Sequence, residues 1–122
     1  MNSNDKLSLM LKNQLQNIQD NKKLSERDMK RIIKYTDNCI FGNECSLWNG
    51  YITNNKGKYI NFYFNNSKTS LIRILYLNYI GYIYDNVYLT NTCQNKGLCC
   101  NINHIIIKKN KPKKEKNTVA FD

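Results

Sequence analysis

Three of the five cysteines and the only histidine of the chain lie within twelve residues, in the segment CQNKGLCCNINH at positions 93–104. A structural zinc ion is held by four cysteine or histidine side chains at the corners of a tetrahedron. Cys93, Cys99 and His104 follow one another at spacings of six and five residues, which is not the spacing of a CxxC knuckle. The segment therefore predicts three ligands of one zinc site whose fourth ligand comes from elsewhere.

The fourth ligand has two remote candidates, Cys45 and Cys39, and one local candidate, Cys100. Adjacent side chains tend to point apart, so we expect Cys100 to be a small buried apolar residue instead. Five cysteines and one histidine cannot complete two four-ligand sites, so we expect at most one structural zinc ion. Two alternatives stay open, namely buried free thiols beside a hydrogen-bonded His104, and a catalytic pair of a cysteine with His104.

A chain of 122 residues has the length of one small domain, whose modest core a bound metal would help to stabilise. Its N-terminus lacks the charged region and apolar run of a signal peptide, and no run of about 18 apolar residues is present. An odd number of cysteines without such a signal favours a reducing compartment. We therefore expect an intracellular protein that is not secreted, in the cytoplasm or nucleus, or in a virion or viral factory for a viral source.

The chain is basic, with a formal net charge of +10 and an isoelectric point near 9.4. Residues 1–36 hold eight Lys or Arg against four acids, and residues 108–122 hold six Lys against two acids. This balance favours a polyanionic partner, above all nucleic acid. A/T-rich codons, which encode the abundant Asn, Lys, Ile and Tyr, are a second explanation of the charge. Such a composition would suit an A/T-rich microbe or a large DNA virus.

The N-terminal region predicts two helices. Apolar residues at three- and four-residue spacing predict the first helix over about residues 5–20. The sequence LSERDM then predicts a capping box, in which Ser25 caps a helix over about residues 26–36 and Asp28 reaches back to it.

The middle of the chain predicts a mixture of strands and one helix. Two runs rich in β-branched and aromatic residues, at 47–53 and 58–64, are separated by NNKG and predict a hairpin. The sequence LIRILYLNYIG predicts a helix that Gly81 closes in a left-handed conformation. A short strand at 86–90 is expected to enter the cysteine cluster, and IIIKK is expected to leave it.

Four segments in order resemble the zinc-binding loop region of His-Me finger homing endonucleases, which are HNH-like proteins of the ββα-metal class. CSLWNGYI resembles the family's Cys, Trp, Gly opening of a strand, and LIRILYLNYIG resembles its Arg-Leu-x-Tyr helix ending in Gly. GYIYDNVYLTNTCQN is similar to the Gly-x-Ile-Pro…His-x-Cys segment, and CCNINHI is similar to the Cys-x-Asn-Pro-x-His-Leu end. The resemblance covers about half of the chain, from Cys45 to His104.

The resemblance implies an α+β fold, with a small zinc-stabilised ββα-metal domain at residues 38–108. A helical segment at residues 1–37 would precede this domain, and a basic, disordered tail at 109–122 would follow it. The resemblance implies a structural Zn²⁺ held by Cys45, Cys93, Cys99 and His104. Cys39 is the alternate to Cys45.

Two catalytic positions of the family are filled by residues that cannot do the same chemistry. The family's general base is a histidine two residues before the first loop cysteine, where this chain has Asn91, whose amide cannot take a proton from water near neutral pH. The family's magnesium-binding Asn corresponds to Lys113, which cannot bind a cation. Arg73 matches an arginine that can approach the scissile phosphate. We therefore expect no cleavage, and Mg²⁺ as a cofactor only if activity remains.

The resulting hypothesis is a zinc-stabilised module that binds double-stranded DNA, derives from a homing endonuclease and has lost cleavage activity. The alternatives are an active Mg²⁺-dependent endonuclease and a structural module that docks a protein partner through its N-terminal helices. A homodimer is compatible with each, and no membrane partner is expected. The residues expected to contact nucleic acid are Lys56, Lys58, Tyr59, Asn61, Tyr63 and Arg73.

Overall fold

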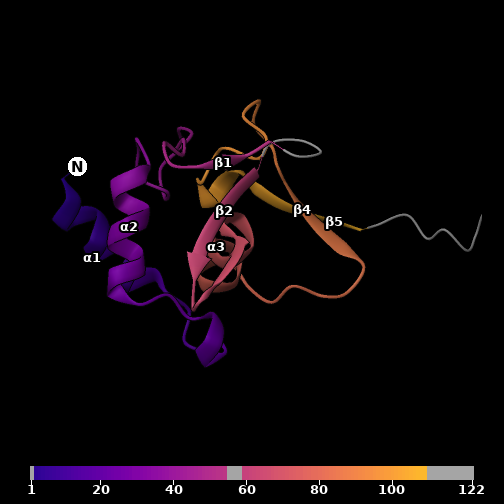
Figure 1. The fold of residues 1–122 in the computed structure, drawn as a ribbon, viewed down its shortest axis with the longest axis horizontal. Helices are drawn as coiled ribbons and strands as arrows, with labels where there is room; N and C mark the ends of the chain where they lie inside the picture. Colours follow the sequence, from indigo (N-terminus) through magenta and orange to yellow (C-terminus); the bar gives the residue numbers. More distant parts are fainter. Residues whose placement is uncertain (1, 55–58, 110–122) are drawn as a thin grey trace, which may run out of the picture.

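The computed structural model describes residues 2–54 and 59–109, which form the α+β fold expected from the sequence (Figure 1). The helices of this part are α1 (Ser3–Asn13), α2 (Glu26–Tyr35) and α3 (Leu71–Tyr79), with short 3-10 helices η1 (Asp20–Lys22) and η2 (Ile102–His104). The strands are β1 (Ile52–Thr53), β2 (Tyr59–Phe64), β3 (Ser67–Ser70), β4 (Val87–Asn91) and β5 (Ile105–Lys109). Lys56 and Lys58, and the basic tail beyond Lys109 that includes Lys113, lie outside the described residues.

The two N-terminal helices pack side by side, as Figure 1 shows at the left of the molecule. The predicted capping box of α2 is confirmed, because the Ser25 hydroxyl accepts a hydrogen bond from the Asp28 N–H and the Asp28 carboxylate accepts one from the Ser25 N–H. None of the helices described is long and apolar enough to cross a membrane.

The predicted helix over residues 5–20 is wrong beyond Asn13, where α1 ends. The reason is a competing set of hydrogen bonds from α3. The Leu15 N–H donates to the Asn78 carbonyl at 2.8 Å, and the Gln14 side chain donates to the Asn78 side-chain oxygen at 2.8 Å. These bonds turn the chain away from the helix axis one residue after its end.

The fully buried side chain of Asn78 also fixes the far end of the connection between α1 and α2, which is residues 14–24. Its oxygen accepts a hydrogen bond from the Leu24 N–H at 3.0 Å, and its nitrogen donates to the carbonyls of Lys22 at 3.0 Å and Ile74 at 2.8 Å. One amide therefore ties both ends of residues 14–24 to α3. Because every polar atom of this side chain is satisfied, its burial carries no desolvation penalty for an unpaired group.

The first sheet has the strand order β1-β2-β3 and is antiparallel. Ile60, Phe62 and Phe64 of β2 are buried on one face, where α3 packs, and Tyr59 and Tyr63 are exposed on the other. The core face of β2 is therefore the one that carries Ile60 and Phe62.

The predicted hairpin is only partly correct. Its second strand exists, but the first is reduced to Ile52 and Thr53. Leu47 and Trp48 instead make isolated bridges to Cys99 and Thr36, so this part of the chain connects the cysteine loop with the end of α2. Strand β3, which lies in the segment NNSKTS at 65–70, is not predicted by the sequence. The two asparagines of this segment adopt positive φ values of 54° and 66° and form the tight turn between β2 and β3.

Helix α3 begins at Leu71 as predicted, but its C-terminal end differs. Ser70 caps the helix by accepting a hydrogen bond from the Arg73 N–H. Gly81 does not adopt the expected left-handed conformation, because Ile80 ends the helix in a right-handed conformation and both N–H groups, of Ile80 and Gly81, donate to the Tyr76 carbonyl. The single core contains residues of all three helices and of both sheets.

The second sheet is the hairpin of β4 and β5, which extends to the right in Figure 1. Its register runs from Val87 opposite Lys109 to Asn91 opposite Ile105. Both strands were expected from the sequence. The loop that joins them holds the cysteine cluster, so the sheet brings the start and the end of the cluster together.

We predict that Asn78→Ala lowers the free energy of unfolding by roughly 2–4 kcal/mol, because it leaves the buried Leu24 N–H and the Lys22 carbonyl without their partner. Urea denaturation followed by circular dichroism measures this change. Asn4→Ala, at an exposed position of α1, is the matched control and should change stability by no more than about 0.5 kcal/mol. Equal effects of both variants would contradict the role of Asn78.

Candidate metal centre

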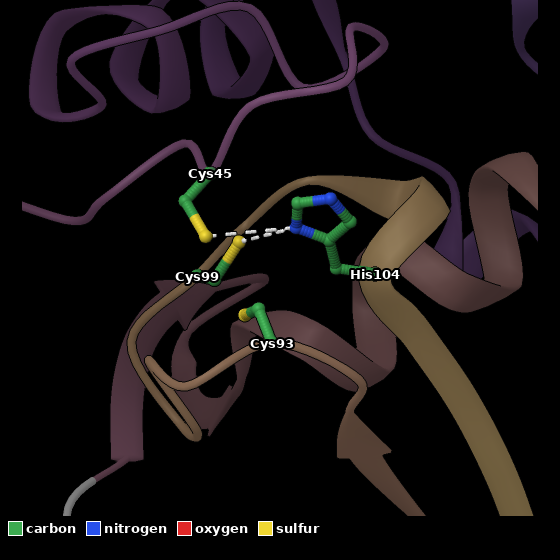
Figure 2. A group of neighbouring side chains, drawn as sticks. All are labelled: Cys45, Cys93, Cys99 and His104. Carbon is green, nitrogen blue, oxygen red and sulfur yellow. Dashed lines mark hydrogen bonds between the residues drawn. The ribbon is translucent and has the colours of Figure 1, made fainter.

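The four expected metal ligands come from two separate parts of the chain (Figure 2). Cys93 and His104 stand near the start and at the end of the loop between β4 and β5, and Cys99 lies between them. The Thr92 N–H donates to the His104 carbonyl at 2.8 Å and so extends the ladder of the hairpin to the base of the loop. Cys45 belongs to the connection between α2 and β1.

Backbone hydrogen bonds hold this connection against the cysteine loop. The Trp48 N–H donates to the Leu98 carbonyl at 3.1 Å, the Cys100 N–H to the Ser46 carbonyl at 2.6 Å, and the Ile102 N–H to the Ile40 carbonyl at 2.8 Å. Residues 40–48 and 98–104 therefore run alongside each other. This pairing places the Cys45 side chain next to the other three ligands.

The ligand atoms of Cys45, Cys93, Cys99 and His104 all lie within 4.8 Å of one another. His104 Nδ1 is 3.6 Å from the sulfur of Cys45 and 3.4 Å from that of Cys99. A tetrahedral ion with bonds of about 2.3 Å to sulfur and about 2.05 Å to nitrogen separates these atoms by about 3.6 Å. The four side chains therefore lie close enough to hold one metal ion, and all five cysteines are free thiols.

The histidine is oriented by a contact on its far side. His104 Nε2 lies 3.0 Å from the Asn43 carbonyl, which can only accept a hydrogen bond. Nε2 therefore carries the proton, and the lone pair of Nδ1 is directed toward the two sulfur atoms. Metal-binding histidines in proteins are commonly fixed by such a hydrogen bond to a backbone carbonyl.

The thiols differ in how easily they lose a proton. A hydrogen bond from the Asn95 side chain, at 3.3 Å from the sulfur, lowers the pKa of Cys45 to about 7 despite its burial. Burial raises the pKa of Cys99 to about 12. Cys99 would therefore stay protonated near neutral pH without a cation, whereas a bound metal ion stabilises the thiolate directly.

Two buried asparagines brace the loops that carry the ligands, and sequence reasoning missed both of these contacts. The Asn91 side chain donates to the Cys99 carbonyl at 3.2 Å and accepts from the Gly97 N–H at 2.8 Å. Gly97 has φ of 81°, a conformation that favours glycine. Asn101 donates to the carbonyls of Gly42 and Glu44 at 2.8 and 2.6 Å and thereby holds the segment before Cys45.

The two remaining cysteines lie outside this cluster. Cys39, the alternate ligand of the sequence prediction, borders a small gap that Met10 and Ile32 also line. Cys100 is fully buried within the core, as expected, and burial raises the pKa of its thiol. Among the described residues, the only group of at least three potential metal ligands is the one formed by Cys45, Cys93, Cys99 and His104.

The predicted nucleic-acid residues that the structure describes are not brought to the metal cluster. Tyr59 and Tyr63 are exposed on the outer face of β2, and Asn61 between them donates a hydrogen bond to the Thr53 hydroxyl across the sheet. Arg73 is exposed on α3 and lines a cavity with Lys22.

No protein-family model matches the chain, and no solved structure matches it. The chain is similar to an uncharacterized protein of Acanthamoeba polyphaga mimivirus, with 49% identity over 108 residues. The match covers 84% of this chain and 32% of the viral protein, so the chain spans about a third of the length of that relative. The relative comes from a virus, which is one of the two kinds of source that the composition would suit.

We predict that the purified chain carries one metal ion and that Cys93→Ser loses it, because three ligands hold a structural ion far less tightly than four. Native mass spectrometry measures the metal content, and thermal unfolding should shift to lower temperature in the same variant. Cys39→Ser is the matched control and should keep one ion per chain. Loss of the metal in Cys39→Ser, or its retention in Cys93→Ser, would show that a different set of ligands is used.

Proposed function

We propose that the chain is a zinc-stabilised module that binds nucleic acid, with double-stranded DNA as its ligand and no cleavage activity. Zinc is the metal that fits three thiols and one imidazole, since soft sulfur ligands in a four-ligand set are typical of structural Zn²⁺. Four protein ligands leave no open position for water or substrate. The zinc ion would therefore stabilise the fold and take no part in chemistry.

The outer face of the first sheet is the observation that carries the binding proposal. Tyr63 of β2 is 57% exposed, and its cross-strand partner on β3 is the exposed Lys68. Directly opposite residues of an antiparallel pair project from the same face, so an aromatic ring and an ammonium group stand side by side. Tyr59 extends this face along β2. We define Tyr59, Tyr63 and Lys68 as the outer sheet face.

The outer sheet face suits contacts to the phosphate backbone. A tyrosine hydroxyl and a lysine ammonium are common donors to phosphate oxygens, and such contacts position a protein without reading sequence. In the described part of the chain, acidic partners engage Lys30 and Arg31 in the only two ion pairs. Most of the basic side chains there are therefore available to a polyanion, in agreement with the net charge of +10.

The surroundings of Asn91 support the absence of cleavage. This side chain is 2% exposed, and both ends of its amide are engaged in hydrogen bonds within the loop. A general base has to reach the proton of an attacking water molecule, and Asn91 has neither the basicity nor the access. The derivation from His-Me finger endonucleases and the ββα-metal arrangement stay part of this proposal, with β4 and β5 as the two strands around the metal loop.

We predict that the chain binds a short DNA duplex with a dissociation constant of roughly 1–100 µM near physiological salt, and that affinity falls steeply as salt rises. Fluorescence anisotropy measures the binding. Lys68→Gln should reduce the slope of log K against log salt by about 1, and Tyr63→Ala should weaken binding at every salt concentration. Lys12→Gln, in the last turn of α1, removes the same charge away from the sheet and should leave the slope unchanged.

An affinity that does not change with salt would reject nucleic acid as the partner. It would favour the alternative of a module that docks a protein. An equal loss of slope in Lys12→Gln and Lys68→Gln would leave binding through diffuse charge and remove the outer sheet face from the proposal.

We predict that neither the native chain nor Asn91→His nicks plasmid DNA in the presence of Mg²⁺. The ring of a histidine fixes the directions of its donor and acceptor, so at this buried position we expect the loss of one of the two hydrogen bonds to Gly97 and Cys99. This loss should loosen the loop between β4 and β5. A gel assay for nicking, together with metal content by mass spectrometry, measures both effects. Cleavage by Asn91→His with the metal retained would show that the other groups of an endonuclease site are in place.

A further inference from the structure

A cavity of about 560 Å³ lies beside α3, on the side of the connection between α1 and α2. Its walls are residues 15–19 and Lys22 of that connection, the α3 residues Arg73 and Leu77, and parts of residues 81–85. This volume falls in the range of small-molecule sites in proteins, which is roughly 300–1,000 Å³. We call it the α3 cavity.

The wall opposite α3 is held in place from within. Asn78 binds the backbone of Leu15 at one end of the wall and the Lys22 carbonyl at the other. The residues between these two ends line the α3 cavity. Because Asn78 fixes one end through its backbone carbonyl and the other through its buried side-chain amide, the α3 cavity is preformed and a ligand does not have to open it.

The lining of the α3 cavity combines three kinds of chemistry. Leu15, Ile18 and Leu77 provide apolar walls, and Arg73 and Lys22 provide two cationic groups. Arg73 forms no ion pair with any residue that the structure describes, so its guanidinium is free to bind an anion. An anionic group attached to an apolar body fits this combination, because the anion would contact the cationic side chains and the body would contact the apolar ones.

The rest of the lining suits a nucleobase on a sugar as the apolar body. The exposed side chains of Gln16, Asn17 and Gln19 offer amides, which can both donate to and accept from the edge of a base. Tyr82 is 67% exposed and offers a ring on which a base can stack. Asp85 would repel a phosphate but can accept a hydrogen bond from a sugar hydroxyl.

We propose that the α3 cavity binds one nucleotide, with its phosphate at Arg73 and Lys22 and its base between the amides and Tyr82. This inference deepens the proposed function and rests on it for the class of ligand. The nucleotide is either a free nucleoside monophosphate or an unstacked nucleotide of a nucleic-acid strand. A fatty acid would use only the apolar walls and the cationic groups, so it fits the lining less well than a nucleotide does.

The test is a titration of the full metal-loaded chain, labelled with ¹⁵N, by each of the four 5′-nucleoside monophosphates. We expect at least one of them to shift amide signals of residues 15–22 and 77–85. The corresponding nucleoside and inorganic phosphate should bind at least about tenfold more weakly, because each lacks one half of the contacts. Arg73→Gln should lower the affinity about tenfold, and Lys22→Gln should lower it less. Lys34→Gln, on α2 outside the α3 cavity, is the control and should bind normally.

Two results would overturn the inference. One is the absence of shifts at these residues with all four nucleotides at millimolar concentration, and the other is binding that neither Arg73→Gln nor Lys22→Gln weakens. Competition identifies the source of the nucleotide, since a single-stranded oligonucleotide displaces the bound monophosphate only if the α3 cavity accepts a nucleotide within a strand. Both competition results support the α3 cavity.

The two proposals fail separately. Duplex binding that depends on Lys68 without nucleotide binding would reject the α3 cavity and keep the proposed function. Nucleotide binding without duplex binding would reject the proposed function and keep the α3 cavity.

Discussion

The attachment of residues 40–48 to residues 98–104 is the constraint on which the rest of the structure depends. Backbone hydrogen bonds pair the two segments, and four side chains that lie close enough to hold a metal ion meet at the centre of the pairing. Each hydrogen bond contributes about 1 kcal/mol, whereas a structural zinc ion contributes about 10 kcal/mol or more in small zinc-binding peptides. The metal ion would therefore dominate the energetics, and the hydrogen bonds would determine which cysteine of the remote loop reaches it. Cys45 is placed in the cluster because its neighbour Ser46 is paired with Cys100.

Buried asparagine side chains hold separate segments of this small protein together through hydrogen bonds. Asn78, Asn91 and Asn101 are each at most 2% exposed, and each connects segments that lie apart in the sequence or in a long loop. A buried amide lowers stability when one of its polar atoms lacks a hydrogen-bond partner. When all of its polar atoms have partners, it favours one unique arrangement of the segments around it. The abundance of asparagine, which composition alone explains by codon usage, thus has a structural use at these three positions. Exposed asparagines elsewhere in the chain need no such explanation.

The sequence predicted the fold best where local signals agreed with tertiary contacts. The capping box at Ser25, the helix that begins at Leu71 and the two strands around the cysteine cluster are of this kind. The prediction failed for the helix beyond Asn13 and for the strand at Leu47. At both places, hydrogen bonds to residues far along the chain override the local preference for a helix or a strand. The grouping of the four metal-binding side chains followed from a resemblance, because spacing alone did not decide between Cys45 and Cys39. The bracing amides gave no signal in one sequence, since a buried asparagine and an exposed one look alike there.

Under the proposed descent from His-Me finger endonucleases, the position of Asn91 explains how the general base is replaced without damage to the fold. Asn91 ends β4 and lies at the base of the loop between β4 and β5, where its side chain reaches the backbone of both Gly97 and Cys99. An amide can donate to one of these groups and accept from the other at the same time, and it keeps this ability at any pH. A neutral histidine also has one donor and one acceptor, but its ring fixes their directions and gains a charge near neutral pH. Asparagine at this position therefore favours the hydrogen bonds of the loop between β4 and β5 over proton transfer. In the proposed module, which binds its ligand without cleaving it, this exchange has no cost in activity.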